Sequence, residues 1–229
     1  MVVKTRLNES ILAGLKRART NKAVLLFSGG VDSTAAGINL LGQGYEVYPL
    51  FVDYGQRAAS AEWYTVNRLS PLLGFKKPLS INQQSVAEFP TQLTSCGDDK
   101  VVTDNQAWVP GRNTLFLVLA GIYAAHLDAD GVCLGYCLED NFVFGDNDLV
   151  HHQLIGVLLT RSLERPVEML MPLAAMNKSA LISLLREREV LDQTVSCWNA
   201  VLTDLTIQVC GQCANCIERA AALAGVNSE

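Results

Sequence analysis

Two groups of residues carry side chains suited to chemistry, and the first is the stretch SGGVDST at 28–34. It combines two adjacent glycines with an aspartate and three hydroxyl side chains. It follows the apolar run AVLLF at 23–27 and precedes an alanine-rich segment, so the pattern predicts a turn between a buried strand and a helix. Backbone N–H groups in such a turn, together with the N-terminus of the helix, favour an anion. We therefore predict a phosphate-binding loop.

The second group is a set of cysteines near the C-terminal end of the sequence. Its members are Cys197, Cys210, Cys213 and Cys216. Two overlapping C-x-x-C pairs with a fourth cysteine upstream suit one tetrahedral four-thiolate zinc site that stabilises the tail. The alternative is redox or sulfur-transfer chemistry at a C-x-x-C pair. The other three cysteines, Cys96, Cys133 and Cys137, lack such spacing and are predicted to be ordinary thiols.

Alternating strand and helix patterns must position these groups. We expect strands at 23–27, 45–55, 76–81, 130–136 and 167–173, and helices at 7–19, 32–44, 58–73, 113–127, 149–163 and 178–190. Residues 83–110 are polar and rich in turn formers, and we expect a loop there. The alternation predicts an α/β fold with a doubly wound parallel sheet, whose ligands bind beyond the carboxyl ends of the strands.

Composition limits the class of protein. The 229 residues suit one main domain at 1–191, with a small metal-binding tail at 192–229. With 49% hydrophobic and 18% charged residues the chain is expected to be globular, and its net charge of -5 gives no reason to expect a nucleic-acid partner. No uncharged apolar run approaches the roughly 18 residues of a membrane span. The start of the chain lacks a secretory signal pattern, so we expect a cytoplasmic protein without a disulfide framework.

The loop at 28–34 differs from two common phosphate-binding motifs. It lacks the lysine of the Walker-type loop and the G-x-G-x-x-G of dinucleotide folds. It resembles the pyrophosphate loop, or PP-loop, of the N-type ATP pyrophosphatases, which adenylylate a carboxylate or carbonyl and release pyrophosphate. The resemblance assigns pyrophosphate and Mg²⁺ to the loop, where the negative charge of Asp32 fits the metal. The residues concerned are Ser28, Gly29, Gly30, Asp32, Ser33 and Thr34.

Three further stretches narrow the resemblance. They are DYGQR at 53–57, WVPGRNTLFLVLAGIYA at 108–124, and SCW at 196–198 together with CGQCANCIERAAAL at 210–223. In order with SGGVDST they resemble the 7-cyano-7-deazaguanine synthase (QueC-like) family over nearly the whole chain. The resemblance implies a Rossmann-like fold of the adenine nucleotide alpha hydrolase type, a homodimer, and a ligase that forms C–N bonds. Such a ligase uses ATP to activate 7-carboxy-7-deazaguanine for attack by ammonia, giving the amide and then the nitrile.

The resemblance also implies roles for single residues. Tyr54, Gly55 and Gln56 would lie near the nucleotide, and Arg112 and Lys178 would supply positive charge for the polyphosphate and the acyl adenylate. The catalytic set would be Asp32, Ser33, Arg112, Lys178 and Asp140. The substrate-binding set would be Arg112, Asn113, Asp140, Phe144, Asp146 and His151.

One segment, EDNFVFGDNDLVHHQ at 139–153, departs from the family pattern D...YPDCR. Asp140 and Asp146 match its two aspartates, but Asp148 stands in place of the arginine. This replacement reverses a charge expected to face an anionic substrate, and His151 or His152 would then restore positive charge or act as acid or base. The histidine that commonly follows YGQR is also replaced, by Ala58.

The departure leaves the acceptor of the reaction open. One alternative is a ligase that joins the activated carboxylate to an amine of a protein or nucleic acid, with a role in antiviral defence. Another is action on a different carboxylate. Further alternatives are a tRNA-modifying PP-loop sulfurtransferase and a nucleotide-binding module without catalysis.

Overall fold

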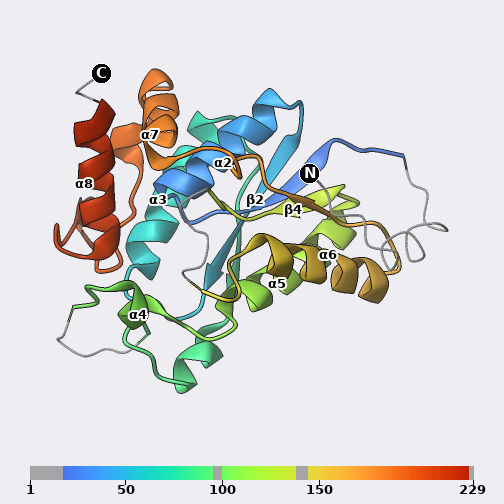
Figure 1. Cartoon of the computed structure of the whole chain (residues 1–229), viewed down its shortest axis with the longest axis horizontal. Coiled ribbons are helices and arrows are strands. Elements are labelled where there is room, and N and C mark those ends of the chain that lie inside the picture. The colour runs from blue at the N-terminus through green and yellow to red at the C-terminus, as the bar shows by residue number, and fades with distance from the viewer. Residues whose placement is uncertain (1–17, 95–99, 138–143, 227–229) are drawn as a thin grey trace.

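The computed structural model describes residues 18–94, 100–137 and 144–226. Five parallel strands form one sheet in the order β3-β2-β1-β4-β5 (Figure 1). The strands are β1 (Lys22–Leu26), β2 (Glu46–Asp53), β3 (Leu79–Asn82), β4 (Gly131–Cys133) and β5 (Glu168–Leu170). The predicted doubly wound parallel α/β sheet is confirmed.

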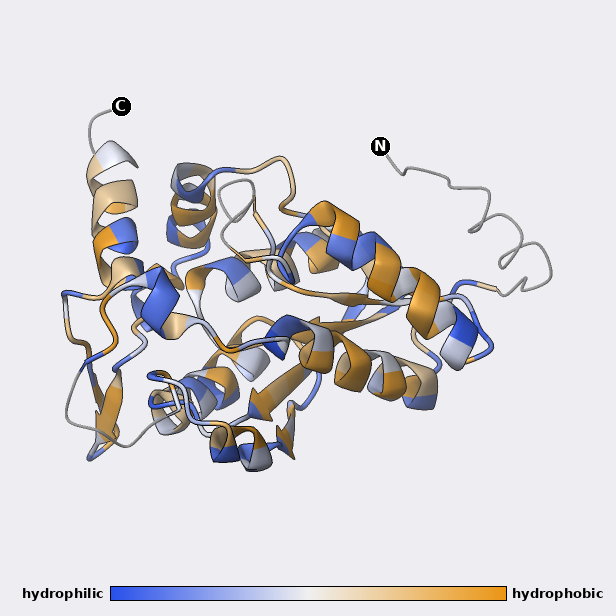
Figure 2. Ribbon diagram, turned by 60° about the horizontal axis from the view of Figure 1, so that its bottom comes forward, coloured by the Kyte–Doolittle hydropathy of each residue, from blue (hydrophilic) through white to orange (hydrophobic). Residues whose placement is uncertain are grey.

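Five longer helices cover the two faces of the sheet. They are α2 (Val31–Gly42), α3 (Ala59–Leu72), α5 (Arg112–Leu127), α6 (Leu149–Ser162) and α7 (Lys178–Glu187). Successive residues of β1 point to opposite faces, so Leu25 packs with α2, α3 and α7, whereas Val24 packs with α5 and α6 (Figure 1). Because both faces are covered, the buried parts of the central strands are apolar, as the colours of Figure 2 show.

The predicted elements in the described part of the chain are present with shifted bounds. The strand expected at 130–136 is shorter, and the helix expected at 7–19 falls almost wholly outside the described residues. The segment expected to be a loop at 83–110 contains the 3-10 helix η1 (Gln84–Glu88) and the one-turn helix α4 (Asp104–Ala107). A capping box between Thr103 and Gln106 explains α4, because each residue bonds a backbone N–H of the other.

The tail contains more regular structure than the sequence pattern predicted. It comprises the 3-10 helix η3 (Leu191–Gln193), the hairpin β6 (Val201–Thr203) and β7 (Thr206–Gln208), and the helix α8 (Ala214–Val226). The hairpin turn places Asp204 and Leu205 at positive φ without the glycine that usually signals such a turn. Helix α8 packs beside α7 (Figure 1). In the described part of the chain, no helix is both long enough and apolar enough to cross a membrane.

Candidate functional site

A cavity of about 240 Å³ opens at the carboxyl ends of β1, β2 and β4. The chain order reverses between β1 and β4, and in open α/β sheets this is where ligands bind. The predicted site residues that line it are Ser28, Gly30, Asp32, Ser33, Tyr54, Gln56, Arg112 and Asn113. The predicted residues Gly29, Thr34, Gly55, Phe144, Asp146, His151 and Lys178 are described but do not line it. Asp140 lies outside the described residues.

The loop at 28–34 forms the turn from β1 into α2, as predicted. Gly29 has φ of +78°, and a Cβ there would lie 2.5 Å from the Cγ2 atom of Thr65, so only glycine fits. Thr34 Oγ1 donates to the carbonyl of Gly30 over 2.7 Å, which fixes the start of α2. No local side chain caps α2. The N-terminus of α2 therefore faces the cavity with donors suited to an anion.

Lys178, the first residue of α7, forms an ion pair with the loop. Its Nζ atom lies 2.7 Å from Oδ1 of Asp32 and 3.5 Å from Oε2 of Glu218 on α8. Lys178 and Asp32 also line a second pocket of about 20 Å³ beside the main cavity. The carboxylate of Asp32 therefore tethers the lysine beside the loop, and the Asp32 oxygens are ligands of the kind that Mg²⁺ prefers.

Arg112, the first residue of α5, places a cation in the cavity. Its Nη1 atom donates to the Tyr54 hydroxyl over 3.2 Å, and its guanidinium carbon lies 5.7 Å from the centre of the Tyr54 ring. Its Nε atom is buried and has no hydrogen-bond partner among the described residues. A cation at a helix N-terminus is disfavoured by the helix dipole. The position of Arg112 therefore suits an anionic ligand, which would accept a hydrogen bond from Nε and offset the unfavourable interaction with the helix dipole.

Glu62 on α3 is a cavity residue that the sequence analysis missed. Gln56 holds it, because Nε2 of Gln56 donates to Oε2 of Glu62 over 2.8 Å while Oε1 of Gln56 accepts from the backbone N–H of Tyr54. Burial raises the pKa of the Glu62 carboxyl group. The available signal was its place in the first turn of the helix that follows DYGQ, at the carboxyl end of β2.

In the segment at 139–153, which departs from the family pattern, two aspartates bond to backbone N–H groups at the starts of helices. Asp148 is the N-cap of α6 and accepts from the backbone N–H of His151 over 2.7 Å. Asp146 accepts from the backbone N–H of Asn113 in the first turn of α5 over 3.0 Å. His151 lies 3.1 Å from the Thr114 hydroxyl, and the fully buried His152 packs against a tyrosine ring. The charge reversal at Asp148 therefore has a local structural use.

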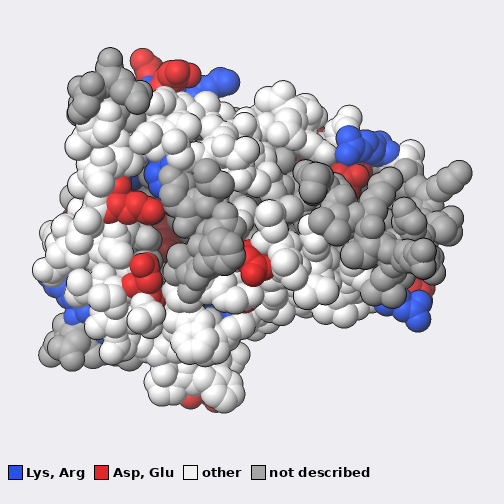
Figure 3. All heavy atoms as spheres, in the orientation of Figure 1, with Lys and Arg blue, Asp and Glu red and all other residues white. Residues whose placement is uncertain are grey.

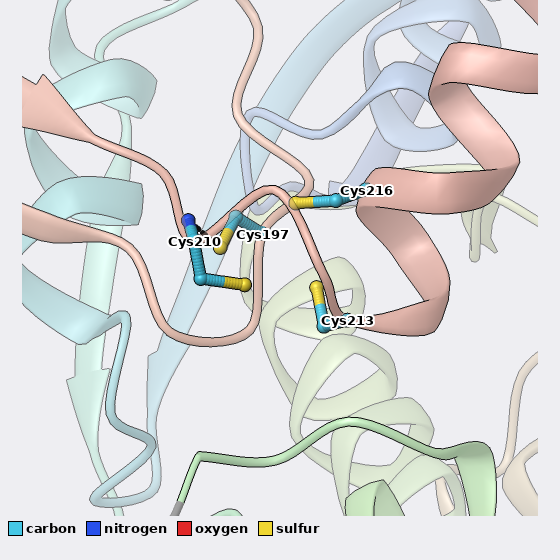
Figure 4. Close-up of side chains that lie close together, drawn as sticks. All are labelled: Cys197, Cys210, Cys213 and Cys216. Atoms are coloured by element: carbon cyan, nitrogen blue, oxygen red, sulfur yellow. Dashed lines mark hydrogen bonds between the residues drawn. The ribbon is translucent and has the colours of Figure 1, made fainter.

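The four cysteines of the tail come together as predicted (Figure 4). Their sulfur atoms all lie within 4.8 Å of one another. Zinc–sulfur bonds of about 2.3 Å place tetrahedral ligands roughly 3.8 Å apart, so this set fits a single ion. The N–H of Cys210 and the amide of Asn199 also donate to sulfur atoms of the set. Burial raises the pKa of the Cys197 thiol, and a bound cation would offset this by stabilising the thiolate.

The cysteine-bearing tail also forms one wall of the cavity. The backbone N–H of Val195 donates to the carbonyl of Gly29 over 3.0 Å, and the hydroxyl of Ser196 accepts from the N–H of Val31 over 3.3 Å. Trp198 and Asn215 line the cavity as well. The stretch SCW contributed to the family resemblance and its cysteine to the predicted metal site, but Ser196 and Trp198 were not predicted to line the cavity.

Solved structures with the same fold share little sequence with the chain. A U34-tRNA thiolase NcsA from Methanococcus maripaludis with its [4Fe-4S] cluster gives a TM-score of 0.51 at 14% identity, over 97% of this chain and 71% of that one. NMN synthetase from Francisella tularensis gives 0.50 at 16% identity, over 84% and 69%. A 4-thiouridine synthetase–RNA complex with bound ATP gives 0.52 at 17% identity, over 90% of this chain and half of that one. These similarities show a shared fold.

The sequence match to a family is more specific. The model of the queuosine biosynthesis protein QueC family matches residues 22–227, which include the loop, the cavity residues and the four cysteines. The chain belongs to the QueC family.

Proposed function

We propose that the protein is a ligase that adenylylates the carboxylate of 7-carboxy-7-deazaguanine, or of a close analogue, and transfers the acyl group to ammonia. Membership of the QueC family makes the chain an ATP-using enzyme, and the proposal adds the substrate and the bond formed. The observation that carries it is the cavity itself, because one space contains the anion-binding loop, an incompletely bonded arginine and an acceptor carboxylate.

The proposed reaction has two activations. A carboxylate oxygen attacks the α-phosphorus of ATP and pyrophosphate leaves; ammonia then attacks the acyl carbon and AMP leaves, which gives the amide. The amide oxygen then attacks the α-phosphorus of a second ATP and pyrophosphate leaves; loss of AMP and of both amide protons gives the nitrile. The loop donors and α2 would hold the departing pyrophosphate, and Arg112 would neutralise charge at the α-phosphate. Mg²⁺, held by Asp32, would further offset the polyphosphate charge.

The metal proposed for the cysteine cluster is Zn²⁺ in a structural role. Four thiolates without an open position are typical of structural zinc sites. An iron–sulfur cubane binds each cysteine to a different iron, which separates the sulfur atoms more than a single ion does. The separations within 4.8 Å therefore favour one ion.

A second candidate is a ligase whose acceptor is an amine of a protein instead of ammonia. The segment at 139–153, which departs from the family pattern, favours this candidate. Its residues Asp146 and Asp148 cap helices, and neither of them lines the cavity. Figure 3 shows one face on which acidic and basic side chains are scattered, with no continuous basic surface among the coloured residues. Together with the net charge of -5, the coloured part of that face favours a small or protein amine over an RNA acceptor.

The test is to identify products by mass spectrometry after incubation with ATP, Mg²⁺ and 7-carboxy-7-deazaguanine, with ammonia or with candidate proteins. A nitrile or amide supports the first candidate, and a protein adduct supports the second. Pyrophosphate release is measured in parallel, and its absence with every carboxylate would overturn both.

Arg112→Ala tests the part of the site that carries the proposal. We expect pyrophosphate release to slow by about 10- to 100-fold, since a hydrogen bond to a charged group contributes about 1.5–3 kcal/mol. Arg112→Lys should recover little, because an ammonium lacks the fork of donors. Arg161→Ala, at an exposed position of α6, is the matched control and should keep the wild-type rate.

A further inference from the structure

We propose that Glu62 determines base specificity by accepting hydrogen bonds from the amino edge of a purine-like base bound in the cavity. The inference rests on the proposed function, since it concerns the same cavity. Glu62 reaches the cavity from α3, on the β2 side of the site.

The cavity that Glu62 lines has both polar and apolar walls. Leu50, Val52 and Phe116 contribute to the apolar walls, and the Phe116 ring lies 5.2 Å from the Tyr54 ring. A planar base suits such apolar walls, and the polar groups beside them then fix its orientation. Glu62 is such a group and offers acceptors when ionised.

The backbone at the end of β2 is already hydrogen bonded. Gln56 accepts from the N–H of Tyr54 over 2.9 Å and donates to the carbonyl of Val52 over 3.3 Å. These backbone groups would otherwise be available to a base edge in this part of the cavity. Because Gln56 bonds to these two backbone groups, the neighbouring carboxylate of Glu62 is the group that would bind the edge of the base.

Glu62 retains acceptor capacity. Among the described residues, its hydrogen-bond donor is Nε2 of Gln56 at 2.8 Å, on Oε2. An ionised carboxylate has about four acceptor positions, so oxygen lone pairs remain for a ligand. Gln56 also holds the carboxylate in place, which reduces the entropy lost when a ligand binds.

A carboxylate in this position selects a base with an amino substituent over a base with an oxo substituent. An amino group donates to a carboxylate, whereas a carbonyl oxygen in the same place repels it. Two bases of the proposed reaction carry such an edge: adenine has one amino group, and a guanine-like base has an amino group beside a ring N–H. The shared chemistry is the amino edge, and the experiment distinguishes the two sources.

The experiment compares wild type, Glu62→Gln and the exposed control Glu187→Gln on α7 by calorimetry with Mg²⁺ present. The nucleotide arm measures the Kd ratio of ITP to ATP, which differ by an oxo group in place of the amino group. The acceptor arm measures the same ratio for 7-carboxy-7-deazaguanine and its analogue without the 2-amino group. We expect the wild type to prefer the amino compound by about 10- to 100-fold in one arm, since the bond involves a charged group.

Glu62→Gln should reduce that preference to within about threefold, because an amide both donates and accepts. Glu187→Gln should retain it. The ratio is compared only where the variant still binds, and a general weakening of binding changes both Kd values together, so a fall in the ratio reports specificity. The inference is overturned if Glu62→Gln keeps the wild-type ratio in both arms, or if the wild type has no preference in either.

A failure of the proposed function can be distinguished from a failure of the inference about Glu62. If wild type binds no ATP and releases no pyrophosphate, the proposed function is overturned, and the acceptor arm alone then decides the inference. If ATP binds and only the ratios contradict the expectation, the proposed function stands and the role of Glu62 is wrong.

Discussion

Two walls of the cavity are built in different ways. The loop at 28–34 is one continuous stretch between β1 and α2, and its shape follows from its own glycines and hydroxyls. A second wall contains Ser196, Trp198 and Asn215, which come from the tail whose four cysteine sulfur atoms lie within 4.8 Å of one another. The backbone N–H of Val195 and the side-chain hydroxyl of Ser196 bond to the loop and join the two walls. The difference teaches that one wall takes its shape from a continuous local motif, whereas the other depends on cysteines that the fold of the tail brings together.

The largest expected effect comes from breaking the cysteine-bearing wall, where Zn²⁺ is proposed to bind. In Cys213→Ala, which removes a fully buried member of the set, bound metal should fall from one per chain toward zero. ATP affinity should drop by about tenfold or more, equivalent to 1.4 kcal/mol, because the wall is no longer held against the loop. Metal analysis and calorimetry measure both. Cys133→Ala removes a buried thiol outside the set and should keep the metal; equal metal loss in both variants would contradict the comparison.

The next largest effect is expected from a change in the wall formed by the loop at 28–34. Gly29→Ala combines backbone strain of about 1–2 kcal/mol with an overpacking cost of about 1–3 kcal/mol against Thr65. Gly44→Ala has a similar positive φ but no atom within 4 Å of the added Cβ, so it should show the strain alone. Urea unfolding of the two variants separates these contributions. Equal destabilisation would mean that contact with Thr65 does not shape the loop.

A smaller effect is expected from removing the hydrogen bond between Ser196 of the tail and Val31 of the loop. Ser196→Ala removes the hydroxyl that accepts from the N–H of Val31, and we expect a loss of about 1 kcal/mol, as for a helix cap. The midpoint of thermal unfolding should fall by a few degrees while the metal content stays unchanged. The exposed Ser60→Ala on α3 is the control. Metal loss in Ser196→Ala would show that this hydrogen bond supports the cysteine cluster as well.

The smallest expected effect is a pH dependence from Glu62. Burial raises its pKa in the folded protein, so Glu62 takes up a proton more readily in the folded than in the unfolded chain. The contribution of Glu62 to stability is then greatest below the unfolded pKa of about 4.3 and falls as pH rises from there through the raised folded pKa. Glu62→Gln should flatten this slope in thermal unfolding measured across pH, and Glu187→Gln should not. An unchanged slope in Glu62→Gln would assign the dependence to other groups.

The sequence predicted the fold and the position of the turn between β1 and α2 well. Strand and helix periodicity identified the sheet because both of its faces are buried, and SGGVDST identified the turn into α2. The pattern failed in the tail, where the short hairpin and α8 depend on contacts with the cysteine cluster and α7. The domain boundary at 191/192, the homodimer and the cytoplasmic location stay predictions.

The sequence by itself determined the family, the parallel sheet, the loop and the grouping of cysteines, since each is encoded by residue type at short spacing. Tertiary structure alone decided that Lys178 pairs with Asp32, that Glu62 joins Gln56 in the cavity, and that Ser196 contacts the loop 165 residues away. The physical reason is that hydrogen bonds and ion pairs across the carboxyl ends of parallel strands connect residues far apart in sequence. No local periodicity encodes such contacts; they form only when the sheet orders its strands.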